Sequence, residues 1–306
     1  MDKDAGAALR DSVICVTGLA WEALSPAGPA CDPSAFLKVK KSRKFMGIQD
    51  DLAVYCAGYA LASAGLLGRA QGERTGLYLS VGYIPFQEAD IGPVLDASVE
   101  DGRFSMRKFA DGGYQRAHPL LTFKCLPNMP AYHVSVNFDL QGPYFVTYPG
   151  PGQLYTALEE AVNALVEGQI DIALVGGVAH QRNFLVEHHY LRIEPPVAAE
   201  RLRDAGAFVV LETDSAARAR GATIRGRLTE LSVEYHPQQH EFHSDRGAMG
   251  ASKEPDPPIE YGAGAPLGAV KQGWDRGLPI VSDITLARDG ILGKSTWVKE
   301  SPGGGP

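Results

Sequence analysis

Short apolar runs bounded by glycine or by a charged residue recur along the first two thirds of the chain. They span Ser12–Thr17, Thr75–Val81, Asp171–Val175 and Ala205–Leu211. Such runs are typical of buried strands in an α/β sheet. Residues Thr223–Tyr235 instead alternate between apolar and polar side chains. This pattern predicts a partly exposed antiparallel strand.

Apolar positions at helical spacing lie between these runs. A helix is expected from Asp50 or Asp51, acting as its cap, to Leu66. A second helix is expected over Leu154–Leu165, and Gly168 ends it. Strands that alternate with helices in this way predict a layered α/β fold.

The last third of the chain has a different pattern. Four prolines and many polar residues predict a long loop over His236–Pro258. A helix is expected over Ala265–Gly277, and short strands over Pro279–Ser282 and Ser295–Lys299. Ser301–Pro306 has the composition of a flexible tail.

Composition and charge exclude several classes of protein. The 306 residues are 44% hydrophobic and 21% charged, which is typical of a soluble globular protein. The net charge of −7 argues against a nucleic-acid partner. No apolar run is long enough to span a membrane, and the polar start Met1–Arg10 does not resemble a signal peptide. We therefore expect a cytoplasmic protein, whose four cysteines are too scattered for a disulfide scaffold or a zinc ribbon.

No motif predicts a cofactor or a metal. Gly293-Lys294-Ser295 lacks the earlier glycine of a phosphate loop, because Arg288 stands there. Gly262–Gly268 misses the dinucleotide fingerprint by one residue. The remaining candidates are three histidines in the proline-rich loop, where a solvated loop is favoured over a metal site: His236, His240 and His243.

Several motifs in one order carry a family resemblance. Gly142-Pro143 leads into a strand, a helix follows, and Gly168–Gly177 reads G-x-x-D-x-A-L-V-G-G. Arg74–Val81 and Asp204–Glu212 match an earlier and a later strand. This arrangement resembles the β-ketoacyl synthase family of the thiolase superfamily. The resemblance implies a layered αβαβα fold with a ketosynthase-like half over 1–215, a shortened half over 216–300 and a flexible tail over 301–306.

The chain departs from that family where the family does its chemistry. Laying the family's T-A-C-x-S elbow on Thr147–Gln153 puts Pro151 at the nucleophile position, between Gly150 and Gly152. Proline has no side-chain nucleophile to activate. The family's two histidine motifs are also missing, and Glu260–Ala265 is the nearest remnant of the second. The resemblance therefore implies a protein without the Cys-His-His condensing triad.

Relatives of this kind are chain-length factors of type II polyketide synthases. The resemblance implies a heterodimer with an active ketosynthase, a growing chain on an acyl carrier protein, and a shared tunnel that sets product length. The interface element would be the segment before Gly142. Its candidate tunnel or interface residues, for each of which ordinary packing is the alternative, are Leu126, Met129, Tyr132, His133 and Ser135.

Two other functions remain open from the sequence. One is residual decarboxylation or hydrolysis of malonyl thioesters by Gln153, His133 or Tyr148. The other is acyl binding by a homodimer. Stoichiometric recovery with a ketosynthase would separate the chain-length factor from the homodimer.

A basic segment near the N-terminus is the candidate docking site for the acidic carrier protein. Five cations fall within seven residues, and a solvated surface is the alternative. The five are Lys38, Lys40, Lys41, Arg43 and Lys44.

Overall fold

One mixed sheet of nine strands organises the molecule. The computed structural model describes residues 12–25, 31–69, 71–192, 196–236, 243–245, 259–287 and 290–301. Strand β2 is parallel to β5 and β6, and all other neighbouring strands of this sheet are antiparallel. In spatial order the strands are β5 (Tyr144–Thr147), β2 (Thr75–Val81), β6 (Ile172–Ala179), β7 (Ala205–Thr213), β1 (Ile14–Ala23), β8 (Gly226–Tyr235), β11 (Ile291–Lys299), β10 (Ile280–Leu286) and β9 (His243–Asp245).

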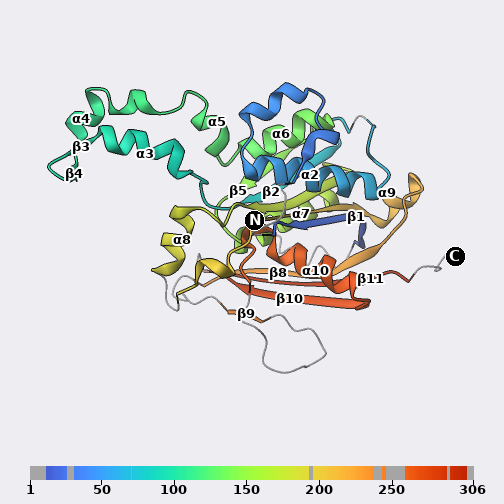
Figure 1. The fold of residues 1–306 in the computed structure, drawn as a ribbon. Coiled ribbons are helices and arrows are strands. Elements are labelled where there is room, and N and C mark those ends of the chain that lie inside the picture. The colour runs from blue at the N-terminus through green and yellow to red at the C-terminus, as the bar shows by residue number, and fades with distance from the viewer. Residues whose placement is uncertain are drawn as a thin grey trace.

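The helices cover the sheet in layers (Figure 1). The α-helices are α2 (Ile48–Ser63), α3 (Glu88–Ala97), α4 (Met106–Ala110), α5 (Leu121–Cys125), α6 (Met129–Phe138), α7 (Gly152–Val166), α8 (Phe184–Leu191), α9 (Asp214–Ala219) and α10 (Ala265–Asp275). Short 3₁₀ helices are η1 (Pro33–Ala35), η2 (Lys40–Phe45), η3 (Gly113–Arg116), η4 (Ala199–Arg201) and η5 (Gly262–Gly264). A separate hairpin pairs β3 (Val99–Glu100) with β4 (Arg103–Phe104).

The sheet folds around a middle layer of helices. Helices α2 and α6 pack on one face of the N-terminal strands, with Leu52, Leu61 and Phe208 in the core between them. Helix α7 packs on the other face and also contacts β8 and β11, while α10 lies between β1 and β10 (Figure 1). Leu158 and Trp297 are among the buried residues of this second core. The predicted layered α/β fold is therefore confirmed.

The outer face of the C-terminal strands carries polar side chains beside two exposed isoleucines of β10, Ile280 and Ile284. Ser282 on β10, Thr296 on β11 and Glu230 on β8 form a hydrogen-bonded row across it, with contacts of 3.1 and 2.9 Å. Among the described residues no helix covers this face. The last strands of the sheet thus differ from the expected αβαβα layering, since the described residues place no helix outside them.

Most predicted elements form, with specific differences. Helix α2 begins at Ile48 rather than at Asp50, because the Asp50 carboxylate accepts a 2.7 Å hydrogen bond from the Gly47 N–H and so acts from inside the first turn. The loop expected over 236–258 contains the short strand β9, and its residues 237–242 and 246–258 lie outside the described residues, as do 302–306 of the tail. The boundary expected near residue 215 falls in α9 and stays a prediction.

A buried polar cluster joins α7 to β10. The Tyr155 hydroxyl donates to the carboxylate of Asp283, which also accepts a 3.0 Å hydrogen bond from Thr285. Tyr155 is fully buried, and Asp283 is 2% exposed. Burial first, and then the charge of Asp283, raise the pKa of Tyr155, so this hydroxyl keeps its proton and remains a donor.

We expect Tyr155→Phe to destabilise the protein by about 1–3 kcal/mol, because it removes a donor from a buried carboxylate. The free energy of unfolding, measured by urea titration, checks this value. Tyr235→Phe is the control, since Tyr235 is 69% exposed. Equal stability of the two variants would contradict a structural role for the cluster.

Candidate functional site

The turn at the start of α7 is the site that the sequence singles out. Strand β5 ends at Thr147, and α7 begins at Gly152 with Pro151 as its N-cap. Pro151 and Gly152 are buried, whereas Gln153 is half-buried. The Ser80 hydroxyl at the end of β2 donates to the Gly150 carbonyl at 3.0 Å and ties the turn to the sheet.

This turn offers no nucleophile of its own. The side chains from Pro149 to Gly152 are two proline rings and two glycine hydrogens, so no thiol or hydroxyl stands there. All four cysteines lie in the described part of the chain, where they are buried and unpaired. Burial above all raises the pKa of Cys125 to about 11, which keeps this thiol protonated and unreactive.

Aromatic and histidine side chains lie beside the turn. The Tyr83 ring stacks edge-on against Tyr148, with ring centres 6.2 Å apart. The Tyr83 hydroxyl lies 3.1 Å from Nε2 of His189 on α8. Sequence reasoning included Tyr148 but missed Tyr83 and His189. The available signal was that Tyr83 follows a buried strand and its terminal glycine.

A buried histidine–carboxylate pair lies at the ends of β6 and β7 and was also missed. His180 Nδ1 is 3.0 Å from Asp204 Oδ1, and both residues are at least 95% buried. Burial raises the pKa of Asp204, but the hydrogen bond and charge of His180, with the backbone N–H of Arg182, outweigh it and lower the pKa below the usual range. This carboxylate therefore stays ionised.

The remnant of the second histidine motif lies against β6. The 3₁₀ helix η5 packs so closely that a Cβ on Gly177 would lie 2.2 Å from the Ala263 carbonyl oxygen. Tyr261 stacks edge-on against Trp21, with ring centres 5.0 Å apart. The segment therefore packs against β6 and also contacts α7, and the residues it brings there are small or aromatic.

The candidate interface residues divide between two faces of α6. Met129 and His133 are buried, Ser135 is half-buried, and Tyr132 is 54% exposed. Leu126, just before the helix, is also exposed. Only part of the predicted set is thus available to a partner.

His133 is poorly placed for chemistry. Burial lowers its pKa to about 4, so it is neutral at pH 7. Its Nε2 has no hydrogen-bond partner within the described ranges. This position does not support the residual thioester chemistry considered for His133.

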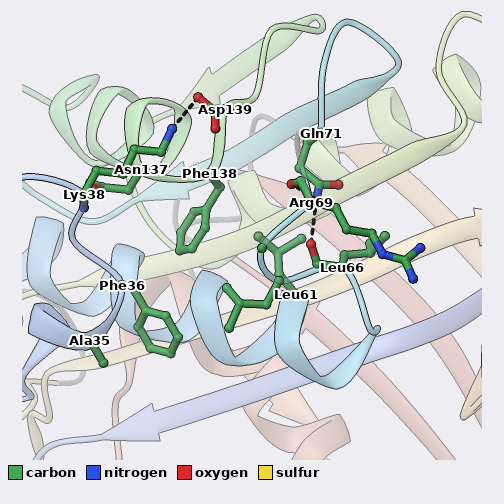
Figure 2. A pocket seen from close by; sticks show the side chains of 12 residues that line it. Ala35, Phe36, Lys38, Leu61, Leu66, Arg69, Gln71, Asn137, Phe138 and Asp139 are labelled. Atoms are coloured by element: carbon green, nitrogen blue, oxygen red, sulfur yellow. Dashed lines mark hydrogen bonds and ion pairs between the residues drawn. The ribbon is translucent and has the colours of Figure 1, made fainter.

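Two of the five cations in the basic segment are paired internally. Lys38 forms an ion pair with Asp139 (Figure 2), and Arg43 bridges Asp32 at 2.5 Å and Asp51 at 3.4 Å. Burial raises the pKa of Asp51 to about 6 despite the Arg43 charge. The exposed cations on η2 are Lys40, Lys41 and Lys44.

A hollow of about 330 Å³ opens beside Lys38 (Figure 2). Phe36, Leu61 and Phe138 form its apolar lining. Gln71, at its edge, precedes β2. The hollow therefore lies at the amino ends of the parallel strands, whereas the α7 turn lies at their carboxyl ends.

Comparison with known proteins shows to which family the chain belongs. The model of the β-ketoacyl synthase N-terminal domain matches residues 14–186, more than half of the chain. The chain belongs to the β-ketoacyl synthase family. Among curated protein sequences, none matches this chain.

Solved structures share the fold at low sequence identity. One, with a TM-score of 0.69 and 12% identity, is a type II polyketide synthase acyl-carrier protein in complex with its ketosynthase bound to the hexaketide; the alignment covers 94% of this chain and 99% of that one. A β-ketoacyl synthase from Burkholderia phymatum gives 0.66 and 14%, covering 95% and 100%. The ishigamide ketosynthase/chain length factor gives 0.64 and 16%, also covering 95% and 100%.

In the described part of the chain, no helix combines the length and the apolar character that crossing a membrane requires. The same part holds no cluster of three or more histidine, cysteine, aspartate or glutamate side chains placed to bind a metal ion.

Proposed function

We propose that this chain is a non-catalytic ketosynthase-like subunit, a chain-length factor that pairs with an active ketosynthase and shapes its acyl tunnel. The observation that carries this proposal is Pro151 at the N-terminus of α7. Aligning the family's T-A-C-x-S elbow on this turn puts its cysteine at this residue. A helix N-terminus stabilises a thiolate. The N-terminus of α7 has no thiol to act on, because Pro151 stands there. The chain thus keeps the fold of the family without its cysteine nucleophile at this turn.

An exposed sheet edge supports pairing with another subunit. Strand β5 is the end strand of the sheet, and its Tyr144 is 70% exposed. An unpaired edge strand favours addition of a further strand from a partner. The exposed Tyr132 and Val136 on α6 add apolar surface, since α6 leads directly into β5. Aromatic side chains of this kind are typical anchors of protein interfaces.

The exposed lysines of η2 are proposed to receive the acyl carrier protein. Lys40, Lys41 and Lys44 project from one short helix, while Lys38 and Arg43 are held by Asp139, Asp32 and Asp51. Exposed cations close together in the chain attract an acidic partner and speed its association, and Lys44 also lies over the Phe45 ring at 4.7 Å.

We expect Pro151→Cys to leave condensation at background level. A thiol alone lacks the two histidines that the family uses, and neither family motif is present in this chain. The measurement is condensation of an acyl starter with malonyl carrier protein by the isolated variant. Appreciable product from this variant would contradict the assignment as a non-catalytic subunit.

We expect Met129→Ala or Tyr132→Ala to lengthen the products of the reconstituted complex by at least one extension unit. Each added methylene gains about 0.8 kcal/mol on burial until a bulky side chain blocks the tunnel. Beyond that point, overpacking opposes growth. Mass spectrometry of the products is the readout, with Tyr235→Ala as the exposed control. Unchanged length in both variants would place the gate elsewhere.

A further inference from the structure

Residues 88–125, here called the arm, project from the body of the molecule (Figure 1). The arm contains α3, the β3–β4 hairpin, α4, η3 and α5. Its rings stack on one another, with Phe109 6.0 Å from Phe104 and 6.2 Å from Tyr114. Phe104, Met106 and Tyr114 are each more than half exposed. The arm therefore presents apolar surface but has little packing against the two cores.

A chain of three side chains anchors the start of the arm. Gln87, the N-cap residue of α3, places its side-chain nitrogen 2.7 Å from His180 Nε2. His180 in turn contacts Asp204 through Nδ1 at 3.0 Å. Gln87 lies after β2, His180 directly follows β6, and Asp204 directly precedes β7. These hydrogen bonds therefore link the start of the arm to the ends of three strands.

One tautomer of His180 gives each hydrogen bond among these three side chains its direction. Asp204 accepts the hydrogen on Nδ1, and in this tautomer Nε2 offers a lone pair. Nε2 then accepts a hydrogen from the Gln87 amide. Asp204 also accepts from the Arg182 backbone N–H at 2.9 Å, which holds the carboxylate in place.

We propose that the Asp204–His180–Gln87 chain is a latch that fixes the position of the arm and thereby raises affinity for the partner subunit. The part that concerns the partner rests on the proposed function. Gln87 is exposed, whereas His180 and Asp204 are buried. The buried pair is therefore a rigid anchor, and Gln87 is the positioning residue that the arm supplies.

Hydrogen exchange of the full-length chain tests the latch directly. Gln87→Leu removes the bond to His180 and leaves the buried pair intact, so the variant should fold. We expect backbone amides of α3 to exchange about fivefold faster or more, because local opening loses one hydrogen bond, while amides of β6 and β7 keep their rates. Gln115→Leu is the matched control: it lies in the arm, and its side-chain amide donates a 3.3 Å hydrogen bond to the neighbouring Tyr114 hydroxyl.

Gln87→Lys is the rescue variant, because its side chain keeps a hydrogen donor for Nε2 and so keeps the arm in place. Slow exchange in this variant, with fast exchange in Gln87→Leu, supports the latch. Exchange in Gln87→Leu that matches the Gln115→Leu control would overturn it. Faster exchange without loss of ketosynthase affinity overturns the role of the latch in binding. If the natural chain binds no ketosynthase while exchange still rises, the latch stands and the proposed function fails.

Discussion

Arg220→Ala is expected to destabilise the protein by about 3–5 kcal/mol, because it leaves a buried carboxylate without its cation. Glu212 on β7 is fully buried. The Arg220 guanidinium donates two hydrogen bonds of 2.6 Å to this carboxylate, and a third of 3.0 Å to the Ala64 carbonyl at the end of α2. Thr17 on β1 donates to the same carboxylate at 2.5 Å. The Glu212–Arg220 pair thus joins β7, β1 and α2.

Arg218→Ala is the matched control for this prediction. Arg218 lies two residues earlier on the same segment and pairs with Asp214 at 2.6 Å on the surface. Exposed pairs contribute little to stability. Urea titration of both variants measures the difference. A change for Arg220→Ala as small as that for Arg218→Ala would contradict the account of a buried ion pair.

The double variant Tyr132→Ala/Tyr144→Ala is expected to weaken ketosynthase binding at least 30-fold. Exposed aromatic anchors of an interface cost about 2 kcal/mol or more when truncated, which corresponds to about a 30-fold change in Kd. Neither ring is part of the buried core, so the variant should keep its fold. Surface plasmon resonance against the immobilised partner gives the Kd, and Tyr235→Ala is the control away from β5. A Kd equal to that of the control would remove these two residues from the interface.

The strands and helices were predictable where a local pattern suffices. Thr75–Val81 was predicted with the bounds that β2 has in the structure, because a fully buried strand is a continuous apolar run that ends at glycine. The arm was not predicted, because α3 contains Pro93 and Val94 is the one fully buried residue of this helix, which removes the apolar periodicity. The pairing of β8 with β1 was also not predictable, since the two strands are about two hundred residues apart and no local signal specifies partners.

The candidate site was predictable only in its backbone. Motif order located the turn at Pro151 because family resemblance follows sequence order. His180 and Asp204 have no common motif, and they meet because β6 and β7 are antiparallel neighbours, with Ala179 opposite Ala205. Tyr132 is exposed and His133 is buried because of the orientation in which α6 packs against α2. The spacing of apolar residues in the sequence does not determine that orientation.

The most direct test of the central claim is recovery of the tagged chain from its native cells, with mass spectrometry of proteins that co-elute in equal amount. The proposed function predicts a ketosynthase of full length with an intact Cys-His-His set, in equal stoichiometry with this chain. Recovery of the chain only with copies of itself would contradict the claim and favour the homodimeric acyl-binding protein.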